Sequence, residues 1–144
     1  MTQARPVRLF LDTNVLISAA WKDGSKVIQL WELANVQLLT SPYVLIECRR
    51  NLPGRDQQLR LERLLEKIEI FHAHQGIVLP ENTLLPDKDL PVLAAAVFAR
   101  ADFLVTGDKR HFGQWYGAAF LGVRIDPPGT VLELLQDENQ HQSH

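Results

Sequence analysis

The chain has 144 residues, of which 46% are hydrophobic and 22% charged, and its formal net charge is −2. This length suits one domain with a buried core, and this composition excludes a disordered chain. No apolar stretch approaches the ~20 residues of a membrane-spanning helix. Arg8 and Asp12 interrupt the first apolar run, which argues against a signal peptide, and the single cysteine, Cys48, cannot form an internal disulfide. We therefore expect a cytoplasmic protein with no membrane segment.

Short apolar runs and helical patterns alternate along the chain. In order, the sequence predicts a strand at 7–11, a helix at 26–34 after Ser25, a strand at 36–40, and a helix at 42–51 after Ser41-Pro42. A charged, leucine-spaced helix follows at 55–69. A helix at 90–100 then leads into a strand at 102–106, followed by a strand at 122–125 and a helix at 130–135. The alternation favours a three-layer α/β/α sandwich around a central, mostly parallel sheet. We expect residues 1–136 to form this single domain and 137–144 to be a polar, disordered tail.

An aspartate follows each of two apolar strands. Asp12 ends the run Leu9-Phe10-Leu11, and Asp108 comes after Phe103-Leu104-Val105-Thr106-Gly107. The carboxyl ends of parallel strands meet at one edge of a sheet, where ligands bind. Taken singly, each aspartate is equally compatible with a turn in which it binds its own backbone.

Two further acids lie in a predicted helix or at the start of one. Glu47 lies in an apolar helical stretch, where a lone glutamate usually faces solvent and can pair with Arg50 or Asn51. Asp89 is a candidate helix N-cap, and the helix dipole would keep a capping carboxylate ionised. Asp87 offers a second acid at the same place, so the sequence leaves the choice between Asp87 and Asp89 open.

Other kinds of site are less well supported. Cys48 has no evident base partner, and His72 and His74 have no cysteine or further histidine close by for zinc. The chain has no glycine-rich dinucleotide motif and no phosphate-loop lysine. Clustered carboxylates instead suit Mg²⁺ or Mn²⁺, one or two ions, because these ions prefer oxygen ligands.

Basic residues are concentrated near the acids although the net charge is slightly negative. Five of the 15 basic residues fall between positions 49 and 63, and Lys109, Arg110 and His111 directly follow Asp108. A polyanion would thus meet a basic rim around an acidic centre. On charge alone, a solvated helical face explains 49–63 equally well.

In combination, these motifs resemble the PIN-domain family of metal-dependent ribonucleases, and within it the VapC-type toxins of bacterial toxin–antitoxin pairs. Leu9-Phe10-Leu11-Asp12-Thr13-Asn14 is similar to the family's opening motif, and Ser41–Glu47 to its second. The densest match runs from Asp87 to Phe112, and the resemblance spans roughly residues 7–135.

The resemblance implies an acidic quartet of Asp12, Glu47, Asp89 and Asp108 as catalytic residues and metal ligands, with Asn14 and Thr106 orienting it. It also implies an RNA substrate, a cognate antitoxin and a homodimer. We expect Arg49, Arg50, Lys109 and Arg110 to hold phosphates that flank the cleaved bond. Two alternatives remain open: an RNA-processing nuclease without an antitoxin, and a non-catalytic acidic pocket that binds a basic peptide.

Overall fold

The computed structural model describes residues 5–72 and 85–142, and of 137–142 only the backbone. The first part contains β1 (Val7–Leu11), α1 (Thr13–Trp21), η1 (Lys26–Ile28), α2 (Gln29–Glu32), β2 (Val36–Thr40), α3 (Pro42–Arg50), α4 (Arg55–Leu65) and β3 (Ile68–Ile70). The second contains α5 (Leu90–Phe98), β4 (Phe103–Val105), α6 (Lys109–Phe112), η2 (Gly113–Trp115), β5 (Ala119–Phe120), β6 (Val123–Asp126) and α7 (Pro128–Gln142). Within these parts no helix is long and apolar enough to cross a membrane.

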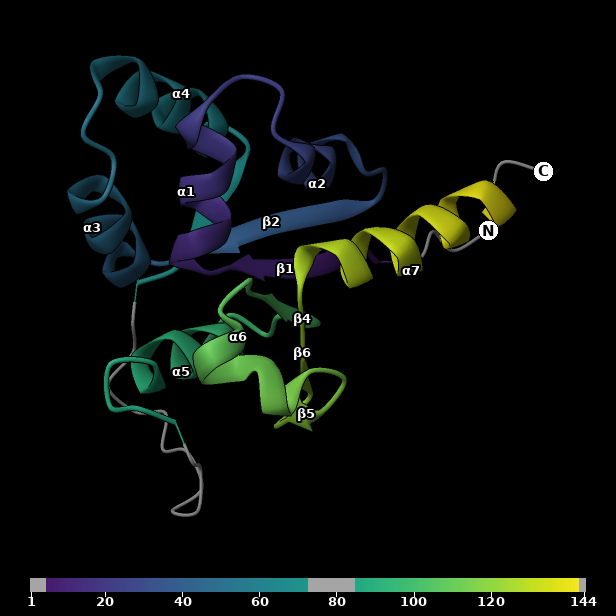
Figure 1. Ribbon diagram of the computed structural model, residues 1–144. Helices are drawn as coiled ribbons and strands as arrows, with labels where there is room; N and C mark the ends of the chain where they lie inside the picture. The colour runs from purple at the N-terminus through teal and green to yellow at the C-terminus, as the bar shows by residue number, and fades with distance from the viewer. Residues whose placement is uncertain (1–4, 73–84, 143–144) are drawn as a thin grey trace.

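The strands form one sheet in the order β3-β2-β1-β4-β6-β5. All neighbouring pairs are parallel except β5 with β6. In Figure 1, α1, α2 and α4 lie on one side of this sheet and α5 and α6 on the other. Leu9, Phe10 and Leu11 of the central strand β1 have no exposed surface, because helices cover both faces. The expected α/β/α architecture is confirmed.

The sheet has a topological switch point between β1 and β4. From β1 the chain proceeds outward to β2 and β3, and it then returns to the other side of β1 as β4. The connections that leave β1 and β4 therefore diverge, which opens a crevice at the carboxyl ends of these two strands. The N–H of Asp12 donates to the carbonyl of Val105 at 3.0 Å, so pairing continues to the edge of this crevice.

The sequence predicted β1 and β2 with their observed bounds, and it predicted α3 with its cap, in which Ser41 Oγ accepts from the N–H of Val44. Three predictions differ. The helix expected at 26–34 is a 3-10 turn followed by the short α2, and Ser25 makes no side-chain cap. The helix expected at 55–69 ends at Leu65, because Ile68 pairs with Leu38 of β2 instead. The last helix continues past Leu135 to Gln142.

Candidate active site

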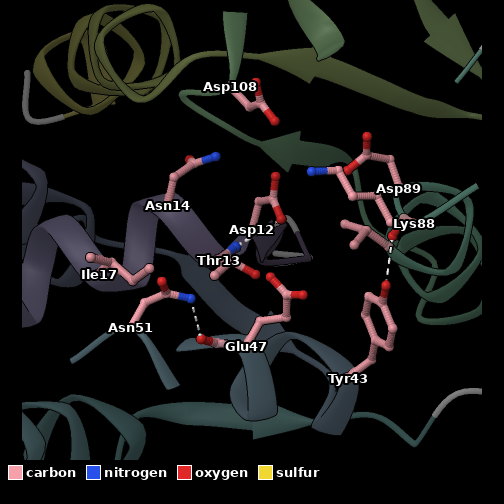
Figure 2. A pocket seen from close by; sticks show the side chains of 11 residues that line it. Asp12, Thr13, Asn14, Ile17, Tyr43, Glu47, Asn51, Lys88, Asp89 and Asp108 are labelled. Atoms are coloured by element: carbon pink, nitrogen blue, oxygen red, sulfur yellow. Dashed lines mark hydrogen bonds between the residues drawn. The ribbon is translucent and has the colours of Figure 1, made fainter. Parts of the chain in front are cut away.

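Four carboxylates from four separate segments line one pocket of about 240 Å³ at the switch point. They are Asp12 after β1, Glu47 on α3, Asp89 before α5 and Asp108 before α6. Figure 2 shows these side chains facing a common space. The remaining lining residues are Thr13, Asn14, Ile17, Tyr43, Asn51, Lys88 and Val92. The structure thus brings together the four acids that the sequence singled out.

Asp12 is the most deeply buried of the four, with 5% of its surface exposed. Its Oδ1 accepts from the N–H of Thr13 at 2.7 Å, and its Oδ2 accepts from Thr106 Oγ at 2.8 Å. Burial raises the pKa of Asp12 to about 6; these two hydrogen bonds oppose the rise, and the charges of Asp89 and Asp108 add to it. The turn role and the site role foreseen for this aspartate therefore coexist.

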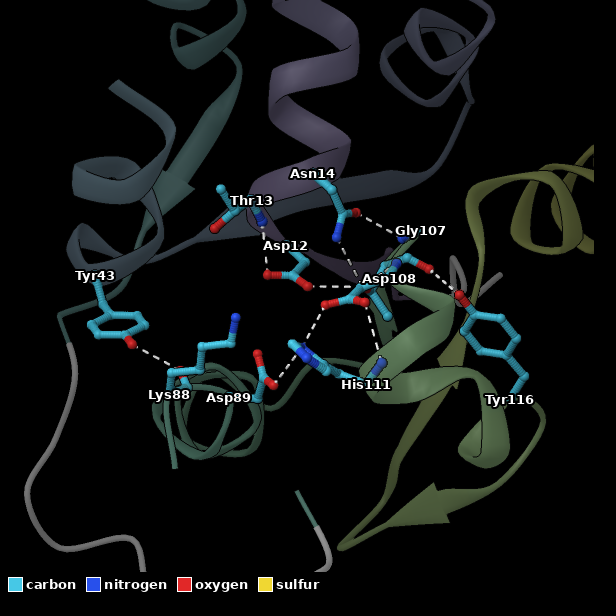
Figure 3. Close-up of polar contacts among 11 residues, drawn as sticks. Asp12, Thr13, Asn14, Tyr43, Lys88, Asp89, Gly107, Asp108, His111 and Tyr116 are labelled. Carbon is cyan, nitrogen blue, oxygen red and sulfur yellow. Dashed lines mark hydrogen bonds and ion pairs between the residues drawn. The ribbon is translucent and has the colours of Figure 1, made fainter. Parts of the chain in front are cut away.

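A small polar network joins the β1 and β4 sides of the pocket (Figure 3). Thr106 Oγ donates to Asp12 and accepts from the N–H of Asp108 at 3.1 Å. Asn14 Oδ1 accepts from the N–H of Gly107 at 2.7 Å. A Cβ at Gly107 would lie 3.3 Å from Asn14 Oδ1, so glycine permits this close approach. Asn14 and Thr106 thus link the segment after β1, which carries Asp12, to the segment after β4, which carries Asp108.

Asp89, and not Asp87, faces the pocket. Asp89 is 8% exposed and lines the cavity, whereas Asp87 is exposed and does not line it. Although Asp89 occupies the N-cap position of α5, its side chain makes no capping hydrogen bond, contrary to expectation. Burial raises its pKa, the charges of His111 and Lys88 lower it, and those of Asp108 and Glu47 raise it. Its carboxylate is therefore directed to the cavity and not to the helix.

Asp108 caps the short helix α6. Its Oδ1 accepts from the N–H of His111 at 3.2 Å. Its Oδ2 lies 2.9 Å from His111 Nδ1, and the same ring nitrogen lies 3.0 Å from Asp89 Oδ2. Asp89, Asp108 and His111 each offer one ligand atom within 4.8 Å of the other two. His111 is a functional candidate that the sequence did not predict, because there it is visible only as part of a basic run.

Glu47 is exposed, and Figure 2 shows its carboxylate pointing into the pocket from α3. The pairing expected for it with Asn51 involves the backbone instead, because Asn51 Nδ2 donates to the carbonyl oxygen of Glu47 at 2.8 Å. The carboxylate of Glu47 thereby stays available to a ligand at the pocket mouth.

Lys88 is the one basic residue among the described residues that line the pocket. The hydroxyl of Tyr43 donates to the carbonyl oxygen of Lys88 at 2.8 Å, which fixes the backbone of this turn against α3. Figure 3 shows the Lys88 amine pointing toward the carboxylates. A cation in this position can attract the phosphate of a substrate into a pocket that is otherwise acidic.

None of the four basic residues expected to contact RNA lines the pocket. Arg49, Arg50, Lys109 and Arg110 are all exposed. Arg49 pairs with Glu62 at 3.1 Å, whereas within the described residues the other three make no ion pair.

The structure gives little support to a nucleophilic cysteine or a zinc site, the other kinds of site considered from the sequence. Burial raises the pKa of the Cys48 thiol to about 11, although Arg49 lowers it, so this cysteine is a poor nucleophile. His72 is exposed and does not line the pocket, and His74 lies outside the described residues.

The donor set of the pocket fits a hard divalent cation. Carboxylate oxygens dominate it. Asp89 Oδ2 and Nδ1 of His111, which adjoins the pocket without lining it, are buried and have no hydrogen-bond partner among the described residues. Buried polar atoms without partners are rare in proteins and call for a ligand or ion. Several carboxylates in one pocket also repel one another until a cation neutralises them.

Comparison with known proteins agrees with this geometry. No curated protein matches the chain. The VapBC2 complex from Rickettsia felis, solved with a DNA fragment from its promoter, aligns with a TM-score of 0.64 and 18% identity over 84% of this chain and 98% of that chain. VapC20 from Mycobacterium tuberculosis, a toxin that cleaves the sarcin-ricin loop, aligns with a TM-score of 0.52 and 20% identity over 81% and 98%. At these identities the two structures show a shared fold. The model of the PIN-domain family matches residues 8–110, which include all four pocket acids, and the chain therefore belongs to the PIN-domain family.

Proposed function

We propose that this chain is a metal-dependent endoribonuclease that hydrolyses RNA phosphodiester bonds, and that it is the toxin of a toxin–antitoxin pair. The observation that carries the proposal is the convergence of four carboxylates from four chain segments on one pocket at the switch point of the sheet. Membership of the PIN-domain family and the fold shared with VapC20 and VapBC2 support the same function.

Mg²⁺ or Mn²⁺ would be held by Asp12, Asp89 and Asp108, with Glu47 available to a second ion. A bound ion of this kind lowers the pKa of water and polarises the phosphoryl oxygens. The protein orients the ligands: Thr106 and the N–H of Thr13 fix the carboxylate of Asp12, and the N–H of His111 fixes one oxygen of Asp108. Glu47 at the mouth of the pocket accepts the proton of the attacking water, and Lys88 binds a phosphate oxygen.

The substrate is single-stranded or loop RNA, whose exposed backbone can enter a shallow site. Arg49, Arg50, Lys109 and Arg110 bind flanking phosphates around the acidic centre. Because water attacks without use of the 2′-hydroxyl, the products carry 5′-phosphates. The toxin assignment adds a cognate antitoxin and a homodimer, which size-exclusion chromatography with light scattering would detect.

RNA cleavage by aspartate variants tests the proposal. We expect Asp12→Asn and Asp108→Asn to lose more than about 100-fold of the Mg²⁺- or Mn²⁺-dependent activity, since outer-shell partners of metal ligands alone are worth 10–100-fold. The assay follows 5′-labelled RNA with each metal and with EDTA. Asp56→Asn is the matched control, because Asp56 is an exposed aspartate of α4 that does not line the pocket.

Undiminished cleavage by either folded pocket variant would overturn the mechanism. A wild-type protein that cleaves no RNA with any divalent metal, but binds a basic peptide in EDTA, would instead favour a non-catalytic acidic pocket. If this protein cleaves RNA and no antitoxin gene lies next to its own gene, the RNA-processing alternative would be favoured.

A further inference from the structure

The imidazole of His111 adjoins the pocket and contacts two of its four acids, Asp89 and Asp108. Its Nδ1 lies 2.9 Å from Asp108 Oδ2 and 3.0 Å from Asp89 Oδ2. The side chain is 18% exposed, so the ring is mostly enclosed by the protein. We propose, resting on the metal-dependent function above, that His111 Nδ1 is itself a ligand of the divalent ion and makes the site prefer Mn²⁺ to Mg²⁺.

The spacing of the three donor atoms suits an octahedral ion. Two ligands on adjacent positions of such an ion, each ~2.1 Å from it, lie ~3.0 Å apart. The two distances from Nδ1 have this value, and all three donor atoms lie within 4.8 Å of one another. Asp89, Asp108 and His111 therefore offer one nitrogen and two oxygens to a common point.

The other explanation of this contact is an ion pair in which a protonated ring bridges the two carboxylates. A bridging N–H should make a hydrogen bond to at least one oxygen. Neither short contact has that geometry, and among residues 5–72 and 85–142 both Nδ1 and Asp89 Oδ2 are buried without a hydrogen-bond partner. Two unpartnered atoms that face each other at 3.0 Å are better accounted for as two ligands of one ion.

The local fold supports a ligand role for all three residues. Asp108 uses Oδ1 to cap α6 and keeps Oδ2 on the side of the ring. Asp89, despite its N-cap position, leaves its carboxylate free of the helix. His111 follows Asp108 by three positions, which places the imidazole and the carboxylate on one face of the helical turn.

A nitrogen donor changes which metal is favoured. Mg²⁺ keeps oxygen ligands and several waters. Imidazole is a ligand of first-row transition metals, and Mn²⁺, although it also suits oxygen ligands, accepts a nitrogen donor more readily than Mg²⁺ does. The prediction is that His111 accounts for much of the Mn²⁺ affinity and for little of the Mg²⁺ affinity. This departs from the acid-only site that the sequence suggested.

Pulsed electron paramagnetic resonance of Mn²⁺ in the full chain provides the test. Loss of the free Mn²⁺ signal measures Mn²⁺ affinity, and its return on addition of Mg²⁺ measures Mg²⁺ affinity by competition. We expect ¹⁴N modulation from one imidazole in the wild type, replaced by the ¹⁵N pattern when histidine is isotopically labelled. His111→Gln should abolish the modulation and lower Mn²⁺ affinity at least ~10-fold, with less than ~3-fold change for Mg²⁺. His72→Gln applies the same substitution to an exposed histidine and should change neither.

The outcomes separate the two proposals. Mn²⁺ bound without nitrogen modulation in the wild type would overturn the role of His111 and leave the nuclease function standing. No Mn²⁺ or Mg²⁺ binding at millimolar concentration would overturn both. Where His111→Gln fails to fold, the labelled wild type still shows whether a histidine binds the ion, and a variant with the other four histidines, His72, His74, His141 and His144, replaced by glutamine assigns it. Nitrogen modulation that disappears in this variant would overturn the role of His111.

Discussion

The two ends of the β1–β4 strand pair each carry an aspartate, and the two aspartates differ in their partners and in the direction of their pKa shifts. At the amino end, Asp102 accepts two hydrogen bonds from the guanidinium of Arg5 and one from the N–H of Arg8 at 2.8 Å. At the carboxyl end, Asp12 is buried beside other carboxylates, and its hydrogen-bond donors in the described part of the chain, Thr13 and Thr106, are neutral. Burial acts to raise the pKa of both; at Asp102 the arginine contacts outweigh it and the net pKa is lowered, whereas at Asp12 the pKa rises to about 6.

This contrast separates a structural acid from one reserved for a ligand. Asp102 forms an ion pair with Arg5, whereas Asp12 forms none within the described residues, although Lys88 lines the same pocket. Asp126 supports this distinction, because it ends β6 near the pocket, is paired with Arg124, and does not line the cavity. A carboxylate left unpaired in a buried position destabilises the fold, and such positions are typical of functional sites.

The largest effect expected on stability comes from Asp12→Asn. Because the pKa of Asp12 is higher in the folded than in the unfolded chain, the folded state binds the extra proton between about pH 4 and 6. The stability of the metal-free protein should therefore fall as pH rises through that range. Asp12→Asn removes this loss and should stabilise the protein at pH 7.5 by up to roughly 3 kcal/mol, with no gain at pH 4. Urea unfolding in EDTA at both pH values measures it.

With a divalent metal present, the wild type should become more stable than Asp12→Asn. An ion that binds only the folded wild type stabilises it by mass action, and Asp12→Asn forgoes much of that gain. Equal destabilisation by Asp12→Asn at both pH values in EDTA would contradict the description of Asp12 as an unpaired, strained carboxylate.

At the opposite end of the strand pair, Asp102→Asn should change the stability in the opposite direction, lowering it, and by a smaller amount. The lowered pKa of Asp102 stabilises the fold at pH values above the ordinary aspartate pKa, and this contribution disappears as pH falls through the lowered pKa. The variant should be less stable by about 1–2 kcal/mol at pH 7, chiefly because the N–H of Arg8 keeps a poorer acceptor. Urea unfolding at pH 7 and pH 2.5 checks this.

RNA cleavage per folded molecule should be unchanged in Asp102→Asn, since this residue lies at the end of the strands away from the pocket. If Asp102→Asn were as stable as the wild type at pH 7, or more stable, the contrast between a structural Asp102 and an unpaired Asp12 would be wrong.

Much of the fold could be predicted because it depends on patterns that are local in sequence. The strand at Val7–Leu11 is a continuous apolar run, and Ser41-Pro42 is a strong helix start. The helix α1 was missed, since Thr13 and Asn14 suggest a turn and the apolar residues after them have no clear helical spacing. Ile68 continues the leucine spacing of α4 but pairs with β2, a tertiary choice that periodicity cannot settle.

The residues of the site also fall into those that the sequence predicts and those that only the structure identifies. Asp12 and Asp108 could be foreseen because each follows an apolar strand, and parallel strands bring their ends together. The choice of Asp89 over Asp87 needed the direction of each side chain around the turn before α5. His111 was overlooked because its charge was weighed and its spacing from Asp108 was not. A histidine three residues after an acidic helix cap is the signal that would have found it.

The smallest expected effect extends the contrast of paired and unpaired charges to the basic rim. Lys109 and Arg110 make no ion pair within the described residues, whereas Arg49 pairs with Glu62. A free cation releases counterions when it meets a phosphate, and a paired one must first give up its carboxylate. Lys109→Gln and Arg110→Gln should each lower the salt dependence of single-stranded RNA binding by ~0.7 in log–log slope, and Arg49→Gln by less. Fluorescence anisotropy in EDTA, where the RNA stays intact, measures these slopes; a larger change for Arg49→Gln would place the RNA over α3 and α4 and away from α6.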